Sequence, residues 1–188
     1  MKNLNKLIFA ALFAALTFVA TYVIKLPTPT MGYIHPGDAV VLLSGILLGP
    51  LYGGLAAGLG AMLADLLGGY FSYAPATFLI KMLTAIIAAF IYKELQSFWK
   101  KEKKGVSAII AGTFGELFMV LGYFIYEIFL LGILTGGLTP EAITSGIAAS
   151  AAGVPFNVVQ GLFGVIICTL LLPILSPVLT KALNDYSN

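Results

Sequence analysis

Four ionisable residues interrupt long apolar stretches of this 188-residue chain: Asp65, Lys81, Glu116 and Glu127. A charged side chain in apolar surroundings is costly when it has no partner, so it usually pairs with another charge or contacts a substrate. We expect Asp65 and Lys81 to form a structural ion pair or to contact a ligand. The same alternatives apply to Glu116, which can instead pair with a polar group between helices.

Amide and ring side chains extend this set. Asn157 and Gln160 are three residues apart, so they share a helix face, and both amides donate and accept hydrogen bonds. Asp38 directly precedes an apolar run and is expected to cap a helix. The depth of these residues in their stretches predicts one outer layer of Asp65, Lys81, Glu127, Asn157 and Gln160, with Tyr33, His35, Asp38, Tyr70 and Tyr73 in loops above it.

The motifs of common enzymes are absent from the sequence. It contains no G-x-x-x-x-G-K-[ST] nucleotide loop, no H-E-x-x-H zinc helix and no G-x-S-x-G nucleophile turn. His35 is the single histidine, so a Ser–His or Cys–His pair within an apolar stretch is not available. We therefore expect a protein that is not an enzyme and that binds no metal or cofactor.

The elements that must position these residues cross a membrane. Hydrophobic residues make up 60% of the chain and charged residues 10%, whereas soluble domains carry roughly 25% charged residues. A crossing helix needs about 20 residues, so the length fits a single all-α domain, 1–188, with about six crossings. Nucleic-acid binding is not expected, because the net charge is only +2 and no basic stripe is present.

The apolar runs predict six transmembrane helices at about 4–24, 38–49, 51–67, 75–92, 106–131 and 155–175. A loop rich in proline and glycine, 25–37, follows the first run, and a hydrophilic loop, 93–105, follows the fourth. Thr139, Pro140 and Glu141 together are typical of a helix start. They predict a short extra helix, 140–152, in the outer loop before the sixth crossing.

The lysines orient these crossings. Eight of the ten fall on one side of the six-helix arrangement: Lys2, Lys6, Lys93, Lys100, Lys101, Lys103, Lys104 and Lys181. Positively charged loops face the cytoplasm. Both termini are therefore predicted to be cytoplasmic, in a multi-pass protein of the plasma membrane.

Small residues form stripes on several of these helices. On the first helix Ala10 and Ala14 are four residues apart, and so are Ala11 and Ala15. Such stripes allow two helices to approach closely. They favour packing inside the bundle, and on the first helix they also fit the docking of another membrane protein.

The chain resembles the S components of energy-coupling factor (ECF) transporters, which are the substrate-binding membrane subunits of vitamin importers. It is most similar to the riboflavin, pyridoxine and hydroxymethylpyrimidine group. The stretches that carry the resemblance are 35–41 (HPGDAVV), 49–70, 75–81 (PATFLIK), 116–127 (ELFMVLGYFIYE) and 155–161 (PFNVVQG), together with the alanine stripe on the first helix.

The resemblance implies six helices, a vitamin site near the outer face, and a coupling subunit that docks on Ala10, Ala11, Ala14 and Ala15. It also implies two partner ATPase subunits, which fits the missing nucleotide loop, and delivery by reorientation in a bacterial plasma membrane. The expected substrate-binding residues are Asn157, Gln160, Lys81, Glu127, Tyr123, His35, Tyr33, Asp65 and Tyr70. These residues are few and polar, and they include both acidic and basic side chains. Such a set suits a single small ring with hydroxyl groups, so it favours pyridoxine or hydroxymethylpyrimidine. Riboflavin is the alternative, and a small membrane enzyme or a scaffold without ligand is the alternative of another class.

The lysine distribution makes the topology testable. Single cysteines placed in the loop 93–105 of a Cys168→Ser background should resist a membrane-impermeant thiol reagent in whole cells and react after the membrane is permeabilised. Labelling from outside the cell would contradict the predicted orientation.

Overall fold

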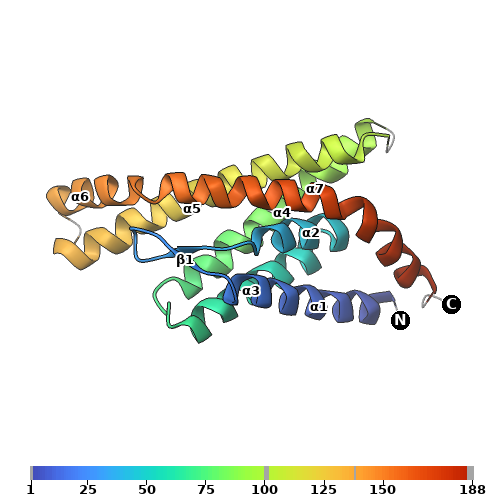
Figure 1. The fold of residues 1–188 in the computed structure, drawn as a ribbon, viewed down its shortest axis with the longest axis horizontal. Helices are drawn as coiled ribbons and strands as arrows, with labels where there is room; N and C mark the ends of the chain where they lie inside the picture. Colours follow the sequence, from blue (N-terminus) through green and yellow to red (C-terminus); the bar gives the residue numbers. More distant parts are fainter. Residues whose placement is uncertain (1, 100–101, 138, 186–188) are drawn as a thin grey trace.

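The computed structural model describes residues 2–99, 102–137 and 139–185, and its architecture is all-α, as predicted (Figure 1). Two short strands, β1 (Leu26–Pro27) and β2 (Tyr33–Ile34), pair antiparallel in the loop before the second helix. The helices in the described ranges are α1 (Lys2–Tyr22), α2 (Asp38–Leu48), α3 (Pro50–Gly68), α4 (Ala74–Phe98), α5 (Lys104–Gly136), α6 (Pro140–Ala151) and α7 (Val154–Asp185).

Five of these helices are long and apolar enough to cross a membrane: α1, α3, α4, α5 and α7. α2 is apolar but has only 11 residues, which corresponds to about 16 Å of helix, roughly half of a bilayer's hydrocarbon thickness. The crossing expected over 38–49 therefore coincides with a helix that is too short to span alone. The count of six crossings stays a prediction.

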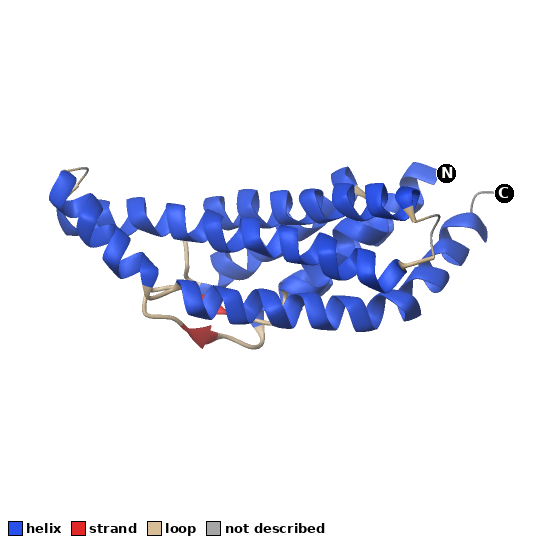
Figure 2. Cartoon of the chain, turned by 90° about the horizontal axis from the view of Figure 1, so that it is seen from above, coloured by secondary structure: helices blue, strands red, loops and turns tan. Residues whose placement is uncertain are grey.

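α2 lies in the middle of the helix bundle. It contacts α1, α3, α4 and α7, and eight of its 11 residues are buried. The five long helices run alongside one another around it (Figures 1 and 2). A helix that is apolar on all sides is stable only when it is covered on all sides, so the composition of α2 explains its central place.

Two glycines allow helix backbones to touch in this bundle. A Cβ atom added to Gly60 of α3 would lie 2.3 Å from the carbonyl oxygen of Ala14 in α1. One added to Gly45 of α2 would lie 2.2 Å from the carbonyl oxygen of Ala85 in α4. Since no real Cβ contact is that short, these two helix pairs require glycine at the crossing.

The alanine stripe of α1 is divided between two environments. Ala10 is buried and Ala14 is half-buried, with its backbone against Gly60 of α3. Ala11 and Ala15 are exposed on the other side of the helix. The first pair therefore packs within the bundle, and only the second pair presents a free surface to a partner.

Three helices extend beyond the predicted boundaries, and one of them is α5, which ends at Gly136 rather than near 131. α4 ends at Phe98 rather than near 92, because the charged residues after Tyr92 are good helix formers and no glycine or proline interrupts them. α7 continues to Asp185 rather than ending near 175, although Pro173 and Pro177 lie within it. Figure 1 shows its C-terminal part bent away from the rest of the helix, as prolines are expected to cause.

α6 begins where the sequence predicted. Thr139 is its N-cap, and the Oγ1 atom of that threonine accepts a hydrogen bond of 3.2 Å from the backbone N–H of Ala142. The helix packs on the end of α5 that lies farthest from the chain termini (Figure 1). Its place at the outer membrane interface stays a prediction.

The contact at Gly60 predicts a large effect of one added methyl group. Gly60→Ala should lower the free energy of unfolding in detergent by about 1–3 kcal/mol, because α1 and α3 must move apart. Gly105→Ala is the matched control, since a Cβ there meets nothing within 4 Å. Equal melting temperatures for the two variants would show that α1 and α3 do not pack this tightly.

Candidate functional site

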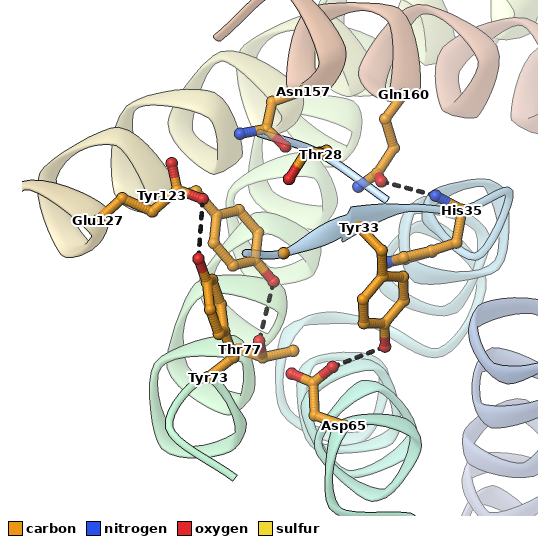
Figure 3. A pocket seen from close by; sticks show the side chains of 11 residues that line it. Thr28, Tyr33, His35, Asp65, Tyr73, Thr77, Tyr123, Glu127, Asn157 and Gln160 are labelled. Carbon is orange, nitrogen blue, oxygen red and sulfur yellow. Dashed lines mark hydrogen bonds between the residues drawn. The ribbon is translucent and has the colours of Figure 1, made fainter. Parts of the chain in front are cut away.

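A pocket with a strongly polar wall lies beneath the loop that joins α1 and α2. The loop and the nearby ends of α3, α4, α5 and α7 all contribute to it (Figure 3). Every lining residue except Gly32 carries a polar side-chain group: Thr28, Tyr33, His35, Asp65, Tyr73, Thr77, Tyr123, Glu127, Asn157 and Gln160.

The loop is held over the pocket by its own hairpin and by one tyrosine. Leu26 pairs with Ile34, and the backbone N–H of Thr28 donates a hydrogen bond of 2.9 Å to the carbonyl oxygen of Gly32. The hydroxyl of Tyr73, just before α4, donates a hydrogen bond of 2.5 Å to the carbonyl oxygen of Thr30. These bonds order a segment that composition alone predicts to be a loop.

Asp65 of α3 contacts the loop rather than Lys81. The hydroxyl of Tyr33 donates a hydrogen bond of 2.6 Å to its Oδ1 atom. Burial and the neighbouring carboxylate both raise the pKa of Tyr33, so the phenol keeps its proton and stays a donor. On its outer side the Tyr33 ring packs against the ring of Tyr70 and the ammonium group of Lys25.

The partner of Lys81 is Asp38, so the expected pairing with Asp65 was wrong. The Nζ atom of Lys81 lies 2.5 Å from Oδ1 of Asp38, and both side chains are fully buried. Asp38 is not the helix cap that we expected, because Gly37 holds that position and no side-chain cap is formed. A buried lysine requires a countercharge, and α2 supplies it from 43 residues away in the chain.

Gln160 of α7 completes this buried network. Its Nε2 atom donates a hydrogen bond of 2.6 Å to Oδ2 of Asp38, and its Oε1 atom accepts one of 2.8 Å from the backbone N–H of His35. The side chain therefore connects α7, α2 and the loop. Gln160 both lines the pocket and supports its wall.

Other groups of the pocket have hydrogen-bonding capacity left over. Glu127 accepts a hydrogen bond at Oε1 from Thr30, and the Tyr73 hydroxyl lies 3.3 Å from the same oxygen. Its Oε2 atom is buried and has no partner in the described part of the chain. The same holds for Oδ2 of Asp65. The side-chain amide of Asn157 makes no hydrogen bond to a described residue, although it is 92% buried. Such groups are costly to bury unless a ligand or water satisfies them.

The cavity itself is small. Its volume is about 20 Å³, enough for about one water molecule. Thr28, Tyr33 and His35 of the loop form one wall. An organic ligand therefore requires this loop to move outward.

Seven of the nine predicted substrate-binding residues line the same pocket, and two do not. Lys81 lies behind the wall, 5.2 Å from the centre of the Tyr123 ring, and Tyr70 lies outside, with its ring tilted by 51° against that of Tyr33. The pocket brings together Asn157, Gln160, Glu127, Tyr123, His35, Tyr33 and Asp65. Their contact with a ligand stays a prediction.

Four further lining residues were not among the expected substrate-binding residues: Thr28, Gly32, Tyr73 and Thr77. Of these, the sequence placed only Tyr73 near the site, in a loop above the polar layer. Thr77 had a usable signal, because it precedes Lys81 by four residues and so shares its helix face. Its Oγ1 atom lies 3.1 Å from the hydroxyl of Tyr123. Thr28 had no such signal in the sequence, since its position at the pocket depends on how the loop between α1 and α2 folds back.

Glu116 lies apart from this pocket. Its side chain is beside Gly161, where α5 meets α7, and both of its carboxylate oxygens are buried without a hydrogen-bond partner in the described ranges. The polar groups nearest to this carboxyl are those of Asp38 and Lys81, so Glu116 borders the buried ion pair without making a regular hydrogen bond. No group of three or more histidine, cysteine or acidic residues gathers in the described ranges to hold a metal.

His35 is held in its neutral form. Its Nδ1 atom accepts a hydrogen bond of 3.0 Å from the backbone N–H of Gly37, which requires an unprotonated nitrogen. Burial and then the nearby Lys81 charge lower its pKa to about 3, although Asp38 acts in the opposite direction. At neutral pH the ring is therefore an uncharged part of the wall.

The low pKa of His35 predicts a loss of stability in mild acid. The unfolded chain takes up the proton near the ordinary pKa of 6.5, but the folded chain does so only near 3. The contribution of neutral His35 to the free energy of unfolding is therefore fully present above about pH 6.5 and decreases as the pH falls toward 3. Between pH 7 and 5 we expect wild type to lose about 2 kcal/mol of unfolding free energy relative to His35→Gln. Parallel pH profiles of thermal unfolding in detergent would contradict this.

Comparison with known proteins gives the family. The family model of the ECF-type riboflavin transporter S component matches residues 1–177. The chain is 35% identical over 125 residues to a Pyrococcus woesei protein described as an uncharacterized protein in a gap 3'region, covering 65% of this chain and 77% of that protein.

The fold is also that of a solved structure. It resembles the S component of a bacterial ECF transporter with a TM-score of 0.63 and 21% identity, over 93% of this chain and 96% of that one. An identity this low shows a shared fold and no more. Together with the family match over nearly the whole sequence, it shows that this chain belongs to the ECF-type riboflavin transporter S components, which are transporter subunits and not enzymes.

Proposed function

We propose that the chain captures a small heteroaromatic vitamin in the polar pocket and passes it to an ECF coupling module. The first candidates are pyridoxine and hydroxymethylpyrimidine, each a single ring with hydroxyl groups. The observation that carries this proposal is the pocket wall, in which every residue except Gly32 offers a polar group. A wall of that kind suits a ligand that is polar around its whole perimeter.

The unsatisfied groups define how such a ligand binds. Oδ2 of Asp65 and Oε2 of Glu127 are acceptors without a donor in the described part of the chain, and ligand hydroxyls supply donors. The amide of Asn157 can donate to a ring nitrogen. Tyr123 offers a ring face for stacking.

Riboflavin is the second candidate, and two observations favour it. The matching family is described as riboflavin transporter S components. In addition, an apolar cavity of about 240 Å³ adjoins the polar pocket and shares His35 and Gln160 with it. The dimethylbenzene edge of a flavin needs an apolar wall of that kind, such as the one that Ile34, Val159 and Phe163 provide.

Transport requires partners in this proposal. The sequence has no nucleotide loop, so the energy is expected from two ATPase subunits, connected through a transmembrane coupling subunit. Six crossings with both termini in the cytoplasm would put the pocket on the outer side. The exposed face of α1 with Ala11 and Ala15 is the surface on which we expect the coupling subunit to dock.

Calorimetric titration identifies the ligand. The purified subunit should bind one equivalent of pyridoxine or hydroxymethylpyrimidine, and mass spectrometry of the denatured sample should detect the same vitamin if it copurifies. Val159→Trp, which fills the apolar cavity, separates the candidates because it should weaken riboflavin binding and leave a single-ring vitamin unaffected. Binding of none of the three would overturn the substrate proposal.

Asn157 and Gln160 should respond differently to truncation. Asn157→Ala should weaken vitamin binding at least about fivefold, because a buried ligand group loses its partner, while the melting temperature stays unchanged. Gln160→Ala should weaken binding and also lower the melting temperature, since it releases Asp38 and His35. Val158→Ala is the control, because Val158 is exposed on the same helix. Unchanged affinity in both Asn157→Ala and Gln160→Ala would remove α7 from the site.

The two alanine pairs of α1 should separate docking from folding. Ala11→Leu should block uptake through the complete transporter and leave vitamin binding by the isolated subunit intact, because only the partner-facing surface changes. Ala14→Leu should reduce the stability of the subunit itself, since Ala14 packs against α3. Normal uptake by Ala11→Leu would show that this face is not the docking surface.

A further inference from the structure

A second, larger cavity opens at the opposite end of the bundle, near the chain termini. Its volume is about 580 Å³, and it lies between α1, the turn that joins α2 to α3, α4 and the start of α5. None of its lining residues belongs to the vitamin pocket. Figure 1 shows why it forms, because α2 stops well before the neighbouring helices do.

The short central helix creates this space. α2 ends at Leu48, and Gly49, with φ of 82°, turns the chain directly into α3. α4 continues on the same side to Phe98. The centre of the bundle below Gly49 is therefore left without a helix, while the surrounding helices continue.

Three lysines from three helices surround the cavity: Lys6 of α1, Lys93 of α4 and Lys104 of α5. All three are exposed, and none lies within 4 Å of a carboxylate in the described part of the chain, where Lys81–Asp38 is the ion pair present. Like charges held around one concavity repel each other and attract an anion. The cavity thus has the charge of an anion site.

The floor of the cavity is apolar, and a hydrogen bond joins two of the helices in its wall. Leu47, Leu48 and Ala89 lie beneath the lysines. The Nε2 atom of Gln96 donates a hydrogen bond of 2.6 Å to Oγ of Ser107, which fastens α4 to α5 at this level. A second cavity of about 190 Å³ continues from it between α2 and α7, past Leu47 and Tyr92. A cationic rim above an apolar floor matches a molecule with a charged head and a hydrocarbon chain.

We propose that this cavity binds an anionic phospholipid, with its phosphate between Lys6, Lys93 and Lys104 and the start of an acyl chain on the apolar floor of Leu47, Leu48 and Ala89. Basic pockets between membrane helices hold phosphate headgroups in this manner. Lys6 and Lys93 lie within a few residues of the ends of the candidate spans on α1 and α4, and Lys104 is the first residue of the span on α5. We therefore expect the three ammonium groups to reach the level of lipid phosphates. The site is separate from the proposed vitamin pocket and does not depend on it.

Native mass spectrometry of the full-length subunit tests this proposal. The probes are phosphatidylglycerol and phosphatidylcholine with identical acyl chains. We expect one phosphatidylglycerol to bind tightly, and Lys6→Gln/Lys104→Gln to weaken it about tenfold or more, at roughly 1 kcal/mol per lysine near a lipid surface. Lys103→Gln/Lys181→Gln is the matched control, because it removes the same charge outside the cavity and should retain binding within about twofold.

Three outcomes would overturn the proposal. The first is that the cavity variant and the control variant bind phosphatidylglycerol equally well, whether both are weakened or both are unchanged. The second is that inorganic phosphate competes as well as the lipid does, which would make free phosphate the ligand. The third is unchanged lipid binding in the cavity variant with a loss of uptake in the complete transporter, which would point to an acidic segment of a partner protein. Equal melting temperatures of the variants verify that each is folded.

Discussion

The buried ion pair between Asp38 and Lys81 is the interaction on which the rest of the structure depends. Both side chains are fully buried in an apolar bundle, where either charge alone would be strongly unfavourable. The pair joins α2 to α4, and Gln160 extends it to α7 and to the loop through the backbone of His35. A helix of 11 residues, too short to span a membrane, is thereby held at one depth in the centre of the bundle.

The polar pocket depends on the same constraint. With α2 held in place, the loop before it is fastened at His35 by Gln160, at Tyr33 by Asp65 and at Thr30 by Tyr73. The side chains that remain open, on Asn157 and Glu127, then face one small cavity. The network of Asp38, Lys81 and Gln160 holds the helices and the loop together. The polar groups of Asn157 and Glu127 are not needed for that and remain available for a ligand.

The length of α2 also shapes the opposite end. Because the helix is about half as long as its neighbours, it leaves space below the turn at Gly49 that the long helices enclose. Lysines that the sequence predicts to face the cytoplasm, among them Lys6 and Lys104, border that space. One short helix thus produces a polar site at one end of the bundle and a basic cavity at the other.

The sequence by itself determined the all-α class, the places of the helices and most of the pocket. Helices in lipid are read from apolar length, and polar residues such as Asn157 and Glu127 stand out locally against apolar neighbours. The partner of Lys81 was not readable: the sequence pointed to Asp65 and made Asp38 a helix cap, and the pairing with Asp38 follows only once α2 is placed. Which alanines of α1 are buried, and that Thr28 reaches the pocket, likewise depended on the fold. The neighbours of a residue in the sequence indicate whether it lies in apolar surroundings. Which residue of another helix it contacts depends on how the helices pack.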